Sequence, residues 1–212
     1  MKIVTGSPVN LEEPIESLLK TMKPGQIINQ VLLPAMQDVG VKFGSGELAL
    51  PFVLQSAEVM RKSIDIISPH MSAGDDMTKG TIVLATVRGD VHDVGKNLVD
   101  IILSNNGFRV VNLGIRQTAS AIMEAVRAES ADAIGLSGLL VSSTEIMRQD
   151  LETFERGGIS VPVLCGGAAL TEKFVDDVLG KAYDGEVFYC PDAFAGLNAM
   201  GKVAKRSEGA MA

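Results

Sequence analysis

The sequence predicts an α/β fold with a helical N-terminal bundle followed by a doubly wound, five-stranded parallel sheet. Three observations predict it. Apolar residues recur at helical spacing over residues 11–69, and short β-branched runs alternate with amphipathic stretches five times after residue 80. A polar, glycine-containing segment at 72–80 separates the two patterns. The sequence therefore predicts two domains, a helical domain at 1–75 and a Rossmann-like, flavodoxin-like domain at 80–205.

The composition is that of an ordinary globular chain. Hydrophobic residues make up 46% and charged residues 21% of 212 residues, which excludes a disordered chain or a disulfide scaffold. A net charge of −7 without a basic run argues against nucleic acid or an anionic membrane as partner. Two cysteines, no signal-peptide pattern and no apolar run near 18 residues make the cytoplasm the expected compartment.

Apolar faces and the positions of the prolines support the prediction of helices in the first half of the chain. Residues 1–10 are polar and turn-rich and predict a loosely held arm. Pro24 suits a helix start, whereas Pro34 should kink or break the second helix because proline removes a backbone donor. The segment 44–51 predicts a break between two helices. Two apolar faces follow: Ile27, Val31, Met36, Val39 and Phe43, then Val53, Leu54, Ala57, Met60, Ile64 and Ile67.

The second half predicts strands and helices in strict alternation. The strands are expected at 81–87, 108–113, 132–137, 161–165 and 186–190, with helices beginning near 94, 118, 144, 171 and 192. Ligands of such sheets bind at the carboxyl ends of the strands. We therefore expect the chemistry in the loops after the first, third, fourth and fifth strands.

The first of these loops contains Asp90 and His92, two residues apart. A carboxylate at this spacing can hydrogen-bond one ring nitrogen and leave the other free for a metal. A hydrogen-bonded histidine without a catalytic role is the alternative. A phosphate-binding loop is disfavoured, because five residues separate Gly89 from Gly95 and Asn97 replaces the expected Ser or Thr.

The third and fourth loops are built from small residues. Ser137 and Leu139 flank a glycine, and one of Ser142, Ser143 and Thr144 is expected to cap the next helix. Gly166 and Gly167 follow the fourth strand. They either let a ligand approach the backbone closely or form a tight strand-to-helix turn.

The spacing of the three loops is more specific than any one of them. The chain reads D-x-H-x-x-G, 41 residues, S-x-L, 26 residues, G-G. This pattern resembles the cobalamin-binding signature of corrinoid methyltransferases and base-off mutases. Residues 42–57 and 86–97 are similar to the cap and cobalamin-binding module of cobalamin-dependent methionine synthases. The resemblance covers roughly residues 24–200.

This resemblance assigns roles residue by residue. It implies that His92 is the metal ligand, binding cobalt from below, and that a proton relay runs from His92 through Asp90 to Ser143. Phe43 and Leu50 would cover the upper, methyl-bearing face. Gly95, Ser137, Leu139, Gly166, Gly167 and Ala193 would line the slot for the displaced nucleotide tail. Further cofactor contacts are expected from Gly89, Val91, Asp93 and Val141, the last where some relatives have Thr.

The resemblance also implies a function. The chain would carry methylcobalamin as a methyl carrier whose cobalt cycles between methyl-Co(III) and Co(I), from methyltetrahydrofolate to homocysteine. The folate and homocysteine sites cannot fit into 212 residues. Folate-binding and homocysteine-binding domains or subunits are therefore the expected partners, together with a reactivation partner.

Other functions remain open on the residues alone. A free-standing corrinoid protein of a methanol, methylamine or aryl-ether methyltransferase shares the cap, the motif and the fold. A light-sensing cobalamin-binding regulator would add a DNA-binding domain, and a mutase subunit would lack the cap. A hydrolase using Ser143, His92 and Asp90 lacks the G-x-S-x-G elbow that presents the serine.

Overall fold

The computed structural model describes residues 10–71 and 78–210, except for the side chains of Asn29 and of residues 207–210. The chain divides into two compact units, Met1–Thr78 with Asn105–Gly107, and Lys79–Ser104 with Phe108–Ala212. Most of the predicted N-terminal arm and of the predicted boundary at 72–80 lie outside the described residues. Within the described part, no helix combines the length and the apolar character that crossing a membrane requires.

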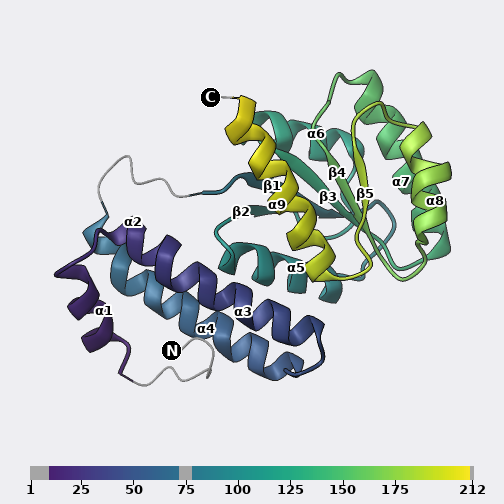
Figure 1. Ribbon diagram of the computed structural model, residues 1–212. Helices are drawn as coiled ribbons and strands as arrows, with labels where there is room; N and C mark the ends of the chain where they lie inside the picture. Colours follow the sequence, from purple (N-terminus) through teal and green to yellow (C-terminus); the bar gives the residue numbers. More distant parts are fainter. Residues whose placement is uncertain (1–9, 72–77, 211–212) are drawn as a thin grey trace. The chain divides into compact units, whose positions relative to one another are not determined.

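The regular elements described in the first unit are all helices (Figure 1). Pro24 occupies the first helical turn of α2, as predicted, because its missing N–H needs no partner there. Pro34 does not break the next helix. It lies in the first turn of α3, directly after a π-helical segment. The elements are α1 (Glu12–Leu19), α2 (Pro24–Ile27), the π-helical segment Ile28–Leu32, α3 (Leu33–Gly44), α4 (Leu50–Ile67) and a 3₁₀ turn at Ser68–His70.

The buried face of α4 corrects one sequence expectation. Leu54 was expected on the inner face, but its side chain is 41% exposed. The inward stripe runs through Val53, Ala57 and Met60, and Leu54 lies about 100° around the helix from Val53. Across the helical unit, the most deeply buried apolar residues are Ile27, Leu33, Met36, Val39, Val53, Val59, Met60 and Ile67.

The second unit confirms the predicted parallel sheet. Its strand order is β2-β1-β3-β4-β5, and every neighbouring pair is parallel. Thr86 of β1 pairs with Ser137 of β3, which pairs with Gly166 of β4, so three strands end at the same level. The strands are β1 (Thr81–Thr86), β2 (Arg109–Asn112), β3 (Ala133–Ser137), β4 (Val163–Gly166) and β5 (Val187–Tyr189).

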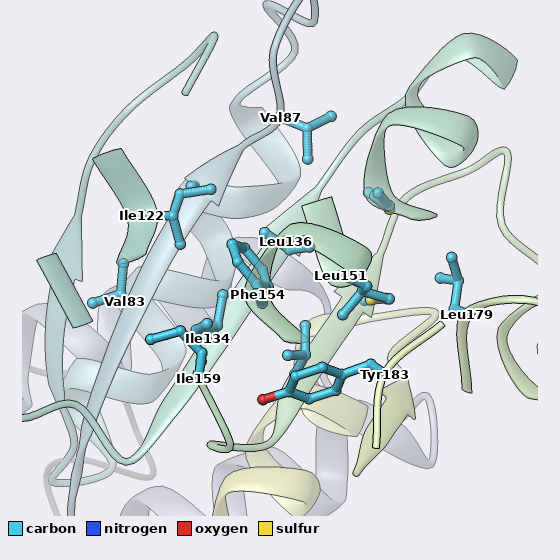
Figure 2. Packing of buried hydrophobic residues seen from close by; sticks show 14 of the residues in the cluster. Val83, Val87, Ile122, Ile134, Leu136, Leu151, Phe154, Ile159, Leu179 and Tyr183 are labelled. Atoms are coloured by element: carbon cyan, nitrogen blue, oxygen red, sulfur yellow. The ribbon is translucent and has the colours of Figure 1, made fainter. Parts of the chain in front are cut away.

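Helices cover both faces of the sheet. Alternate strand residues point to opposite sides, and since the strands are apolar on both sides, each face must be buried. Ile82 and Leu84 pack with Leu103 of α5 and Met200 of α9 on one face. The opposite face packs against α6, α7 and α8, and Figure 2 shows Ile134, Leu136 and Phe154 gathered in that cluster. The helices are α5 (Val94–Asn105), α6 (Ala119–Ala128), α7 (Val141–Arg156), α8 (Glu172–Asp177), a 3₁₀ turn at Leu179–Lys181 and α9 (Ala193–Ala210).

The start of α7 differs from the sequence expectation. The helix begins at Val141 rather than near residue 144, and its N-cap residue, Leu140, makes no side-chain cap hydrogen bond. Neither Ser143 nor Thr144 caps it, because the Ser143 hydroxyl donates to Asp90 and the Thr144 hydroxyl donates to the Val141 carbonyl. The backbone N–H groups just before the helix instead donate to the carboxylate of Asp90. The cap is therefore supplied by a residue about 50 positions upstream.

Candidate functional site

The loops singled out in the sequence open on one edge of the sheet. The chain leaves β1 for β2 on one side and returns to β3 on the other, so the carboxyl ends of β1 and β3 form a topological switch point. The loop after β1 carries Asp90 and His92, and the loop after β3 leads to Ser143. Because β1, β3 and β4 end at one level, these loops are brought together by the strand register alone.

Asp90 is the fully buried centre of this site. Its Oδ1 lies 2.6 Å from the His92 ring Nδ1 and accepts the His92 backbone N–H at 3.0 Å. Its Oδ2 accepts the Ser143 hydroxyl at 2.6 Å and the Leu139 N–H at 2.7 Å. Burial alone would raise the pKa of Asp90, but hydrogen bonds from Ser143, His92 and Leu139 outweigh it and hold the pKa well below its usual range. The carboxylate therefore stays ionised.

One ring nitrogen of His92 is held by Asp90, and much of the rest of the ring is exposed to solvent. Its side chain is 45% exposed, while Nδ1 contacts the Asp90 carboxylate. An ionised carboxylate can only accept a hydrogen bond, so a neutral imidazole must carry its hydrogen on Nδ1. Nε2 is then left with a lone pair, the form in which histidine binds metals. The His92 carbonyl also accepts a hydrogen bond from the buried Thr86 hydroxyl at 3.3 Å.

A cavity of about 400 Å³ lies beside His92, within the α/β unit. It reaches from the strand ends down between the sheet and residues of α5 and α9, including Val99 and Gly196. Every residue that the resemblance assigned to the nucleotide slot lines it: Gly95, Ser137, Leu139, Gly166, Gly167 and Ala193. The structure thus gathers the predicted slot residues around one cavity.

Two positions of this region lack a side chain for different physical reasons. A Cβ on Gly95 would meet nothing within 4 Å, so the missing side chain leaves open space. A Cβ on Gly167 would lie 1.7 Å from the Gly138 carbonyl oxygen, and the φ of Gly167 is +141°. The tight-turn interpretation therefore accounts for Gly167, whereas Gly95 leaves room for a ligand.

The remaining predicted site residues lie near the cavity or in the other unit. Gly89, with φ +83°, and the exposed Val91 belong to the His92 loop, and Asp93 accepts a hydrogen bond from Asn97. Val141 is 80% exposed at the start of α7. None of these four is a lining residue of the cavity. Phe43 and Leu50 belong to the helical unit, where Phe43 is half-buried and Leu50 is 38% exposed.

Sequence reasoning missed several residues around the site. Thr86 is buried beside the His92 backbone, and Lys96 lines the cavity. Lys96 carried a recognisable signal, because it shares a helix face with Val99 and Leu103 at spacings of three and seven. A lysine on an apolar face needs a compensating partner. Thr86 carried no such signal, since a threonine at the end of a strand is ordinary.

The family follows from comparison with known sequences. The B12 binding domain model matches residues 80–196, which include all three loops, and a second B12 binding domain model matches residues 2–68. The chain belongs to the B12-binding family. The predicted cobalamin-binding fold and family are therefore confirmed.

Proteins similar in sequence to this B12-binding chain include methionine synthases. The chain is 51% identical over 212 residues to the methionine synthase of Mycobacterium tuberculosis and 50% identical over 216 residues to that of Mycobacterium leprae. Each alignment covers 98% of this chain but 18% of the relative. The B12-binding chain thus spans less than a fifth of the length of these relatives.

Two solved structures share the fold of this chain. The methanol:cobalamin methyltransferase complex of Methanosarcina barkeri is 28% identical, with a TM-score of 0.81 over 96% of this chain and 77% of that chain. A novel cobalamin-binding protein from Desulfitobacterium hafniense is 23% identical, with a TM-score of 0.75 over 95% of both chains. The second likeness shows the fold alone.

Proposed function

We propose that this chain is the methyl-carrier module of a methionine synthase and that His92 is the lower ligand of its cobalamin. The observation that carries the proposal is the contact between Asp90 and His92. It commits Nδ1 to the carboxylate and leaves Nε2 available beside a cavity lined by small residues. When bound, methylcobalamin would supply the chemistry of passing a methyl group from methyltetrahydrofolate to homocysteine. The 51% identity to a methionine synthase supports this choice.

The residues around His92 suit a histidine that must bind and release a metal. Asp90 orients the ring and makes Nε2 a better donor. Protonation of Nε2 removes the lone pair and ends ligation, and the Asp90 carboxylate stabilises the imidazolium that results. Ser143 donates to the same carboxylate and stabilises its charge. His92 Nε2 can therefore either bind the metal or take up a proton, and Asp90 and Ser143 support both states.

The cavity fits the nucleotide tail that a histidine ligand would displace. Its lining residues are mostly glycine and apolar residues, which suits a long, thin and partly aromatic group. We assign Gly95, Ser137 and Ala193 to this slot, and Phe43 and Leu50 to the cover of the upper face. Folate-binding and homocysteine-binding domains and a reactivation partner complete the proposed reaction, which we place in the cytoplasm.

The test uses the visible spectrum of the loaded protein. The purified chain is incubated with methylcobalamin in the dark, desalted and compared with H92A and with H70A, which removes the other histidine, an exposed residue of the helical unit. We expect a base-on-like spectrum for the wild type and H70A and a base-off-like spectrum for H92A. Cofactor loss from all three proteins, or identical spectra of wild type and H92A, would refute the assignment.

A second candidate is the corrinoid subunit of a methanol-type methyltransferase, which the 28% identity and TM-score of 0.81 favour. The two candidates differ in the methyl acceptor and donor. The loaded chain is mixed either with the homocysteine-binding and folate-binding parts of a methionine synthase or with a methanol methyltransferase subunit. Demethylation of the methylcobalamin-loaded chain by homocysteine supports the first candidate. Methanol-dependent methylation of the chain loaded with chemically reduced cob(I)alamin supports the second.

A further inference from the structure

Lys96 is a buried cation that the proposed mechanism does not use. It is the third residue of α5 and only 3% exposed. Burial lowers its pKa, and the charges of Asp100 and Asp93 partly offset this effect. The positive end of the helix dipole also disfavours a cation at this position. Such an unfavourable placement requires specific compensating contacts.

These contacts are two amide oxygens. The Lys96 ammonium donates to Asn97 Oδ1 at 2.7 Å and to Asn112 Oδ1 at 2.6 Å. Because an ammonium group can only donate, each asparagine must turn its oxygen toward Lys96 and its NH₂ group away. The NH₂ of Asn97 then donates to Asp93 Oδ2 at 3.1 Å, and that of Asn112 donates to Asp100 Oδ2 at 2.7 Å. Lys96 therefore fixes the orientation of both amides.

The oriented amides reach the His92 loop from two directions. Asn97 holds Asp93, the residue directly after His92, through its side chain and also donates its backbone N–H to the Asp93 carbonyl at 2.8 Å. From the other direction, Asn112 Oδ1 accepts the Gly114 N–H at 3.1 Å, and the Gly114 carbonyl accepts the Thr86 N–H at 2.9 Å.

Thr86 completes the second connection, because its hydroxyl donates to the His92 carbonyl at 3.3 Å. The backbone at the His92 carbonyl and at Asp93 is thus tied to one ammonium group, through Asn97 on one route and through Asn112, Gly114 and Thr86 on the other. Lys96 itself is hydrogen-bonded to neither His92 nor Asp90.

We propose that Lys96 is a positioning residue for the cobalt ligand: through Asn97 and Asn112 it fixes the backbone of the His92 loop, so that Nε2 faces the cofactor. This inference rests on the proposed function of His92. A metal ligand loses affinity when its supporting contacts are removed, typically by about 10- to 100-fold for contacts one step away. Lys96 acts on His92 through at least two intervening residues, so an effect at the lower end of this range is expected.

The test compares K96M with K181M, which removes an exposed lysine of the same unit. Each protein is loaded with methylcobalamin in the dark and titrated with acid, and the visible spectrum gives the pH at which half of the cofactor loses its histidine ligand. We expect the K96M midpoint to lie about one pH unit above that of wild type, a tenfold change in proton concentration. K181M should match wild type.

A second variant separates positioning from folding. N97D keeps an oxygen for Lys96 but loses the NH₂ that holds Asp93, so its midpoint should shift in the same direction even if K96M does not fold. Coincident midpoints for wild type and N97D, or for wild type and a folded K96M, would overturn the positioning role. Absence of a histidine-ligated spectrum in the wild type would instead refute the proposed function.

Discussion

The hydroxyl of Ser143 donates a 2.6 Å hydrogen bond to Oδ2 of Asp90, and this contact joins the loop after β1 to the first turn of α7 across 53 positions of sequence. Both groups are buried. The same carboxylate oxygen accepts the Leu139 and Leu140 N–H groups. One oxygen atom therefore stabilises the helix start and, through its carboxylate, the orientation of the His92 ring.

Removal of the Ser143 hydroxyl should destabilise the protein even without cofactor. S143A deprives a buried carboxylate of one charge-assisted hydrogen bond, and we expect the free energy of unfolding to fall by about 1.5–3 kcal/mol. Urea unfolding of the cofactor-free protein measures this value. The neighbouring exposed Ser142 provides the control, since S142A should change stability by less than about 0.5 kcal/mol. Equal effects of the two substitutions would contradict the role assigned to the buried contact.

Gly95 should matter for cofactor binding rather than for folding. Its Cβ would meet no protein atom, so G95A should leave the cofactor-free stability unchanged or raise it by up to about 1 kcal/mol, as expected for alanine in a helix. The new methyl group would narrow the cavity and weaken cobalamin binding by about tenfold, or about 1.4 kcal/mol. Equilibrium dialysis and urea unfolding measure the two effects. The control is G201A in α9, where an added Cβ would also meet no atom within 4 Å, and this variant should bind cobalamin like wild type.

Gly167 should show the opposite behaviour. G167A would press a methyl group into the Gly138 carbonyl, and we expect a loss of more than about 3 kcal/mol of stability or failure to fold. G114A isolates the backbone contribution, since Gly114 has φ +85° but open space around it. It should cost about 1–2 kcal/mol. A G167A loss no larger than that of G114A would show that the backbone relaxes around the added methyl group.

Asp150 should make stability depend on pH. It is 6% exposed, its Oδ2 has no hydrogen-bond partner in the described part of the chain, and burial raises its pKa to about 7, against a smaller opposing effect of Arg88. The folded state therefore holds this proton more tightly than the unfolded state, whose pKa is near 3.8. The contribution to stability is full below the unfolded value and is lost as pH rises toward 7.

D150N mimics the protonated acid and removes this pH dependence. Relative to wild type, we expect its unfolding free energy to increase by at least about 1 kcal/mol between pH 4 and pH 8. Urea unfolding at several pH values tests the expectation. D176N, which changes an exposed aspartate of α8, should leave the pH profile unchanged. A constant difference between D150N and wild type across this range would show that Asp150 is ionised in the folded protein.

The strands were predictable from the sequence, because short β-branched runs bounded by turn residues are typical of buried parallel strands, whose carboxyl ends bind ligands. The slot residues came from the resemblance to the cobalamin-binding signature, and their role stays a proposal. The start of α7 was not. The cap of that helix comes from Asp90, and no local pattern records a partner 50 residues away. The contact of Lys96 with Asn112 was equally hidden, since Lys96 lies on α5 and Asn112 lies 16 positions along the chain on β2. Leu54 was misplaced because apolar character alone does not mark the edge of a buried helix face, and Leu54 lies about 100° around the helix from Val53.

The shared carboxylate of Asp90 also limits how this site could be transplanted. A designer who grafted only the loop with Asp90 and His92 onto another flavodoxin-like sheet would leave Oδ2 without its donors and the ring without a fixed support. The smallest unit that keeps the donors of this oxygen is the adjacent pair β1 and β3 with both following loops and the first turn of α7. Adding α5 and β2 keeps the contacts of Lys96 as well. Engineered corrinoid carriers should therefore be built by exchanging strand pairs rather than single loops.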